Sequence, residues 1–126
     1  MKDYDVIFEY PRTQAIEDGT LVDVSQLAKE AGFRFPVAIT QGVSDLLTPN
    51  EAQERRGQSY DGRLWDVLNV LRYTIKSTRE QTDRIEFKVL LHNRYTGKVQ
   101  YAKLVSVCGP GDDAEPVLTV MLPDED

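Results

Sequence analysis

Nine residues near one end of the sequence hold the types best suited to chemistry. Residues 108–116 read CGPGDDAEP and contain the only cysteine of the sequence together with Asp112, Asp113 and Glu115. Clustered carboxylates on a flexible backbone are the ligands that Mg²⁺ and Ca²⁺ prefer. Glycine, proline and aspartate in this order are equally typical of a tight turn. The stretch is therefore predicted to be a hairpin turn, with a divalent-metal site, a small-ligand site or an enzymatic site as the alternative.

A cysteine nucleophile is the second chemistry that the sequence raises. Cys108 would need a neighbouring base, and His92 is the only imidazole of the chain. The predicted strand pairing places Cys108 well past the partner of His92, and a single histidine without a cysteine pair does not make a zinc site. We therefore expect no catalytic residue, no metal and no cofactor, and a non-enzymatic function is favoured.

Three more side chains are candidates for contact with a ligand or partner. Arg12 is one, and Tyr60 and Arg63 belong to residues 48–63, a polar stretch rich in turn formers that is predicted to be a flexible loop. Tyrosine and arginine side chains near a loop are free to stack on or pair with a ligand. The neighbouring Trp65 is expected in the core instead. These three residues join the carboxylates of 108–116 as the predicted binding residues.

The elements that position these residues follow from hydrophobic periodicity. Leu64, Leu68, Leu71 and Ile75 are spaced by four, three and four residues, which predicts an amphipathic helix lying on a core. The period then changes to two, which indicates strands. Alternating apolar residues occupy Ile85, Phe87, Val89 and Leu91, then Val99, Tyr101 and Val105, and a third apolar run covers 116–122.

The sequence thus predicts an α+β fold with a three-stranded antiparallel meander at its carboxyl-terminal end, covered by the amphipathic helix. A smaller amino-terminal region of helices and strands precedes it. There we expect a strand over residues 4–10, a short helix with Thr13 as N-cap and Gly19 at its exit, an extended segment over 33–40, and a helix capped by Thr40.

Composition limits the class of protein. With 126 residues, 40% hydrophobic and 29% charged, the chain is expected to form one domain, residues 1–126. A net charge of −6 argues against direct nucleic-acid binding, which relies on cationic side chains. No apolar run is long enough for a membrane helix, and a single cysteine fits a cytoplasmic location. The acidic tail at 123–126, with the carboxylates of 108–116, is suited to imitating phosphate charge.

Three stretches together resemble a known but uncharacterised family. They are RTQAIEDGTLVDVSQLAKEAGFRFPVAIT (12–40), DGRLWDVL (61–68) and VCGPGDDAEPVLTVMLPDED (107–126). The chain resembles a bacterial domain of unknown function that occurs on plasmids, phages and other mobile elements. The resemblance implies a small accessory protein of a mobile element. With the acidic balance, it leads us to expect a protein partner, a host-defence component being one candidate.

Overall fold

The computed structural model describes residues 11–79 and 82–126, and within them the architecture is α+β. One mixed sheet has the strand order β1-β2-β5-β4-β3. Its strands are β1 (Leu21–Asp23), β2 (Val37–Thr40), β3 (Arg84–His92), β4 (Val99–Pro110) and β5 (Pro116–Met121). β2 and β5 run parallel, and the other neighbouring pairs are antiparallel. The predicted meander is confirmed by β3, β4 and β5.

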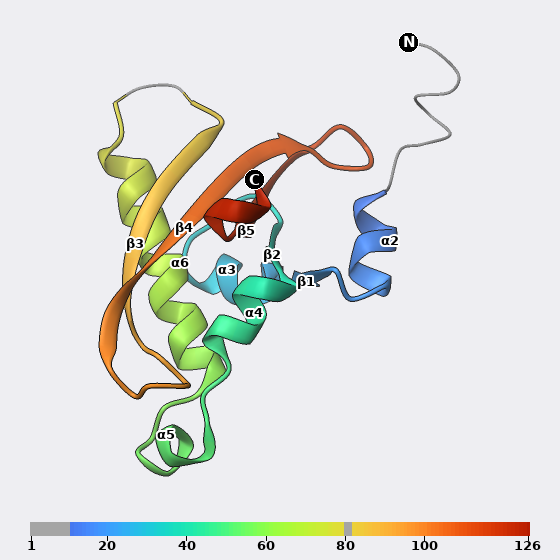
Figure 1. The fold of residues 1–126 in the computed structure, drawn as a ribbon. Helices are drawn as coiled ribbons and strands as arrows, with labels where there is room; N and C mark the ends of the chain where they lie inside the picture. Colours follow the sequence, from blue (N-terminus) through green and yellow to red (C-terminus); the bar gives the residue numbers. More distant parts are fainter. Residues whose placement is uncertain (1–10, 80–81) are drawn as a thin grey trace.

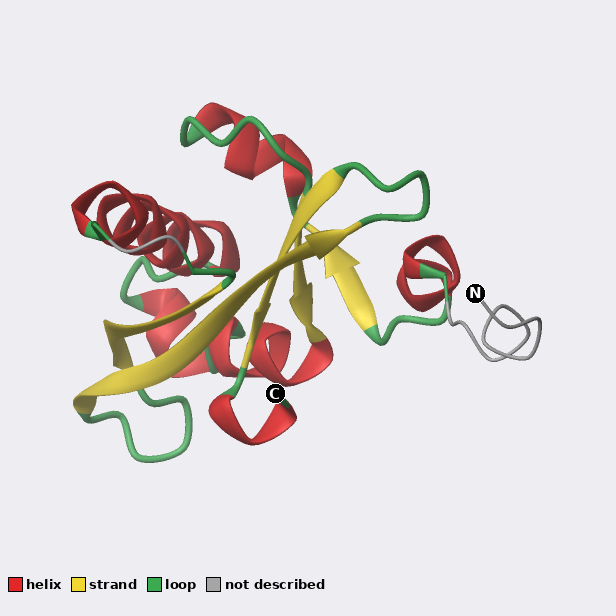
Figure 2. Cartoon of the chain, turned by 90° about the horizontal axis from the view of Figure 1, so that it is seen from above, coloured by secondary structure: helices red, strands yellow, loops and turns green. Residues whose placement is uncertain are grey.

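Helices flank this sheet. They are α2 (Arg12–Glu17), α3 (Ser25–Glu30), α4 (Gln41–Leu47), α5 (Glu51–Arg55), α6 (Tyr60–Ser77) and a 3-10 turn η1 (Pro123–Glu125). In Figure 1 the long α6 lies along β3 and β4, whereas α2 lies at the far side of the sheet. Figure 2 shows the same separation from above, with the strands between the two helices. No helix within residues 11–79 and 82–126 has both the length and the apolar character needed to cross a membrane.

α6 is the amphipathic helix that the leucine spacing predicted. Its buried side chains Leu64, Val67, Leu68 and Leu71 join buried residues of β2, β3, β4 and β5 in one core. Full burial of a side chain of this size is worth about 1.5–3 kcal/mol, so this stripe is what holds the helix to the sheet. The prediction that Trp65 lies in the core is wrong, because it is 40% exposed. With 3.6 residues per turn, a side chain next to Leu64 points well away from the stripe.

The hairpin of β3 and β4 has a buried face and an exposed face. Phe87 points to the core, as the alternation on β3 predicted. The register places Leu90 opposite Tyr101, so the apolar series that begins with Val99 and Tyr101 lies on the face away from α6. Alternation along one strand identifies two sets of residues, but the register of the pair decides which set faces the core.

Residues 48–63, predicted to be a loop, hold α5 and the first turn of α6. Asn50 and Gln53 form a reciprocal capping box at the start of α5. The same two side chains donate to the hairpin connection, Asn50 Nδ2 to the carbonyl of Arg94 (2.6 Å) and Gln53 Nε2 to that of Asn93 (3.0 Å). Gln53 is only 3% exposed. The segment is therefore tied to the connection between β3 and β4 by partly buried polar contacts that a polar sequence does not reveal.

The amino-terminal predictions have mixed outcomes. The strand predicted over residues 4–10 lies outside the described residues. α2 forms where a helix was expected, but it begins at Arg12, so Thr13 is inside the helix and is not its N-cap. Gly19 has φ +81°, the left-handed exit that glycine allows. Thr40 caps α4 as predicted.

The predicted acidic tail is folded back on the sheet. Glu125 lies in η1, and its Oε1 accepts hydrogen bonds from the Thr40 hydroxyl (2.7 Å) and the Leu122 amide (2.8 Å). Asp126 forms a hydrogen-bonded ion pair with Arg84 at the start of β3. Two of the tail carboxylates therefore serve internal contacts.

Candidate functional site

Residues 108–116 form the end of β4, a tight turn and the start of β5. The Gly111 amide donates to the Glu115 carbonyl (2.6 Å), and the Ala114 amide donates to the Gly111 carbonyl (3.0 Å). The Asp113 amide donates to a carboxylate oxygen of Glu115 (3.1 Å). Backbone and side chain together close the turn, so the stretch is the hairpin turn that its glycine and proline residues predicted.

The side chain of Asp112 extends from this turn and caps a helix that is distant in the sequence, α2. Its Oδ1 accepts the amide of Arg12 (2.7 Å), and its Oδ2 accepts the amide (3.0 Å) and the hydroxyl (2.5 Å) of Thr13. The amides at the start of a helix have no partner within the helix, and a carboxylate satisfies them well. These hydrogen bonds, that of the Thr13 hydroxyl first, lower the pKa of Asp112. Asp112 therefore supplies the capping hydrogen bonds that Pro11, the N-cap residue of α2, cannot make with a side chain, and local sequence cannot show this role.

Arg12 fastens α2 to the sheet. Its Nη1 donates to Thr119 Oγ1 (2.8 Å) and its Nη2 donates to the Leu118 carbonyl (2.8 Å). Partial burial lowers its pKa, opposed by the attraction of nearby carboxylates. Four of the predicted binding residues gather here around a hollow of about 200 Å³: Arg12, Asp112, Asp113 and Glu115. Most of their polar groups already serve the fold, and residues 11–79 and 82–126 contain no cluster of three His, Cys, Asp or Glu side chains able to hold a metal ion.

Tyr60 and Arg63 lie apart from that hollow, in the first turn of α6. The Tyr60 hydroxyl shares a 2.8 Å hydrogen bond with the Ser44 hydroxyl of α4. This contact and its partial burial make Tyr60 a link between two helices. The structure therefore divides the six predicted binding residues between two separate regions.

Arg63 is buried, with 5% of its surface exposed. Its Nη1 donates to Gln58 Oε1 (3.0 Å), and its Nη2 donates to the carbonyls of Leu46 (3.0 Å) and His92 (2.7 Å). Its Nε has no hydrogen-bond partner among the described residues. Burial lowers the pKa of Arg63, and the charge of Arg94 adds to this effect. Arg63 thus joins the end of α4, the start of α6 and the end of β3.

The exposed side of the β3–β4 hairpin carries a mixed apolar and cationic surface. We call it the hairpin face, and it consists of Lys88, Leu90, Val99, Tyr101 and Lys103. The three apolar members are 53%, 51% and 67% exposed, in chain order. Leu90 lies opposite Tyr101, and Lys88 lies opposite Lys103. Neither lysine forms an ion pair with a carboxylate of the described residues. The signal in the sequence was the doublet Leu90 and Leu91, which puts apolar side chains on both faces of one strand.

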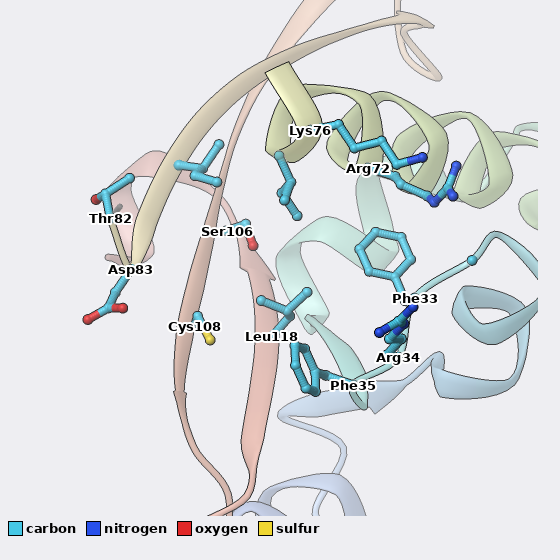
Figure 3. Close-up of a pocket in the computed structure, with 13 residues that line it drawn as sticks. Phe33, Arg34, Phe35, Arg72, Lys76, Thr82, Asp83, Ser106, Cys108 and Leu118 are labelled. Atoms are coloured by element: carbon cyan, nitrogen blue, oxygen red, sulfur yellow. The ribbon is translucent and has the colours of Figure 1, made fainter. Parts of the chain in front are cut away.

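A second concave feature lies on the opposite face of the sheet, the face that α6 covers. This pocket has a volume of about 570 Å³ and lies between the end of α6, the segment before β2, and strands β3, β4 and β5. Figure 3 shows Phe33 and Phe35 near Leu118, with Cys108 beside Leu118 on the neighbouring strand. Sequence reasoning treated the FRFP segment at 33–36 only as an extended stretch, although two aromatic side chains around an arginine were a visible signal.

The whole chain, residues 1–126, matches the model of a family of unknown function, DUF6573. The chain belongs to this family. Comparisons with curated proteins and with solved structures returned no match. Membership of DUF6573 confirms the resemblance to an uncharacterised family that the sequence carries. The match to DUF6573 adds no catalytic residue, so the function is argued from the surfaces described above.

Proposed function

We propose that this DUF6573 protein acts by binding another protein through the hairpin face. The observation that carries the proposal is the concentration of exposed large apolar side chains on one hairpin. Leu90, Val99 and Tyr101 lie on the outward face of β3 and β4, and Tyr95, which is 85% exposed, lies in their connection. Exposed apolar residues gathered on one surface are typical of interaction sites, and tyrosine is among the residues that dominate binding energy.

The charge on this face indicates what the partner presents. Lys88 and Lys103 are directly opposite each other, an arrangement of like charges that destabilises a sheet. A carboxylate placed between them would relieve that repulsion. The partner is therefore a protein segment with apolar side chains beside one or more acidic residues. The net charge of −6 on the whole chain works against nucleic acid as the partner.

Site-specific photocrosslinking tests this proposal. A photoreactive phenylalanine analogue replaces Tyr101 in the protein expressed in its cells of origin. The matched control carries the same analogue at Tyr73, which is 73% exposed on α6 and lies off the hairpin face. We expect one protein to be captured from position 101 and not from 73, and the adduct to disappear when Lys88 and Lys103 are changed to glutamate. Equal capture from both positions would contradict the proposal.

The setting of this binding is a mobile genetic element, with the chain as an accessory protein and a host-defence component as a candidate target. This part of the proposal is supported by the resemblance of residues 12–40, 61–68 and 107–126 to a family found on plasmids and phages. Sequencing the DNA that flanks genes of the family tests it. Neighbouring replication, transfer or virion genes are expected, and a consistent chromosomal housekeeping setting would contradict it.

A further inference from the structure

The pocket of about 570 Å³ has the size of a small-molecule site, which is typically 300–1,000 Å³. Its lining residues come from α6, β3, β4, β5 and the segments before β2 and β3, and its walls are mainly apolar. The apolar side chains that line it are Phe33, Phe35, Ile75, Ile85 and Leu118. Aromatic and branched side chains of this kind accept an apolar chain or ring and exclude water from it.

The rim of the same pocket is cationic. Arg72 and Lys76 are four residues apart on α6, so they lie on one side of the helix, and Figure 3 shows both side chains extending past Phe33. Arg34 adds a third positive charge. Asp83 supplies one negative charge, but Figure 3 shows its carboxylate pointing away from the apolar residues. The rim is therefore positive within a protein of net charge −6.

Among the described residues, these cationic side chains form no ion pairs within the fold. The ion pairs of the described residues involve Arg55 and Arg84, and none involves Arg34, Arg72 or Lys76. The Arg72 guanidinium lies directly over Gly32, because a Cβ on Gly32 would be only 2.5 Å from its Nε. Gly32 also has φ +105°, so the chain turns there without a side chain and leaves room for the guanidinium.

We infer that this pocket binds a small amphipathic anion, an apolar chain or ring that bears one carboxylate, sulfonate or phosphate. The apolar body lies against Phe33, Phe35 and Leu118, and the anionic head meets Arg72 and Lys76. Charge complementarity selects this class, because a neutral hydrophobe leaves the cations unpaired and a cation is repelled. The site is on the opposite face of β4 from the hairpin face, so it does not depend on the proposed function.

Cys108 gives a direct readout, because it lines the pocket and is the only cysteine of the sequence. The rate at which iodoacetamide alkylates it is followed by intact-mass spectrometry with octanoate, 1-octanol or octylammonium present. These probes share one tail and differ in the charge of the head. We expect octanoate to slow alkylation at several-fold lower concentration than 1-octanol, and octylammonium to protect least. Equal protection by octanoate and octylammonium, or protection by neither, would overturn the inference.

Variants test the role of the rim. Arg72→Met and Lys76→Met are each expected to raise the octanoate concentration that halves the alkylation rate by about threefold to about tenfold. This is the range for losing one charge-assisted contact. The exposed Lys76 keeps the test usable if Arg72→Met fails to fold. Arg56→Met removes the same charge directly after α5, outside the pocket lining, and is expected to leave protection unchanged. A loss of protection in Arg56→Met equal to that in Lys76→Met would overturn the inference.

Discussion

Arg63 offers a sharp test of whether a buried guanidinium holds α4, α6 and β3 together. In Arg63→Met, the apolar part of the side chain is kept and the donors are lost. The carbonyls of Leu46 and His92 then lose the Nη2 donor that now lies at 3.0 and 2.7 Å. A buried acceptor left without its partner costs about 1–3 kcal/mol. The substitution also removes a buried charge whose Nε has no hydrogen-bond partner among the described residues. Losing the desolvation penalty of that charge offsets part of the lost stability.

The expected net effect is a loss of about 3 kcal/mol in the free energy of unfolding. For a chain of this length, about 1 kcal/mol corresponds to about 4 °C in Tm, so we expect Tm to fall by about 12 °C. Thermal unfolding followed by circular dichroism, together with urea unfolding, measures both quantities. Arg63→Lys should recover less than half of the loss, because one ammonium group cannot reproduce the fork geometry of a guanidinium.

The matched control lies on the same helix. Arg72→Met removes a half-buried guanidinium for which the described residues provide no hydrogen bond or ion pair, so its effect on unfolding should stay below about 1 kcal/mol. A fall in Tm of less than about 3 °C for Arg63→Met would refute the reasoning. An equal fall for the two variants would refute it too, since it would mean that any arginine lost from α6 has this effect.

Two further predictions concern the hydrogen bonds of α2 and α5. Hydrogen bonds lower the pKa of Asp112 in the folded state, so its contribution to stability is complete above the ordinary value of 3.8 and is lost as the pH falls through the lower folded pKa. The difference in Tm between wild type and Asp112→Asn should therefore become smaller as the pH is lowered from about 6 to about 2.5. Asp113→Asn is the control. A difference in Tm that stays constant over this range would count against the capping role. Gln53→Ala should cost about 2 kcal/mol in urea unfolding, because it breaks the capping box, leaves the Asn50 amide without its acceptor and removes one of the two donors to the Asn93 carbonyl. The exposed Gln26→Ala should cost almost nothing.

Elements whose signal is local could be predicted from the sequence. α6 followed from four apolar residues at helical spacing, and the turn at 108–116 followed from residues that permit few other conformations. Thr40 acts on the helix that directly follows it, so its cap could be predicted as well. α5 was missed although its signal is also local. The capping box of α5 is formed by Asn50 and Gln53. These residues lie within a run of polar residues that is equally typical of a loop.

Contacts between distant residues could not be predicted. Asp112 resembles a turn residue or a metal ligand in the sequence, and nothing near it indicates that it caps α2. Arg63 lies among charged residues, and its burial depends on the carbonyls of Leu46 and His92, which only the fold brings together. The parallel pairing of β2 with β5 is of the same kind, because both strands are short and their order in the sheet depends on how all the layers meet.

The position of β5 has a consequence for how the protein is made. Val37 of β2 pairs with Leu118 of β5, and β5 pairs with β4 on its other side, so the last of the described strands occupies the middle of the sheet. While the chain is being synthesised, β1 with β2 and β3 with β4 can each form a local pair, but the two pairs have no shared neighbour. Both then present unpaired edges, which are sites of aggregation. The five-stranded sheet therefore cannot be completed until β5 has been synthesised and has paired with both β2 and β4.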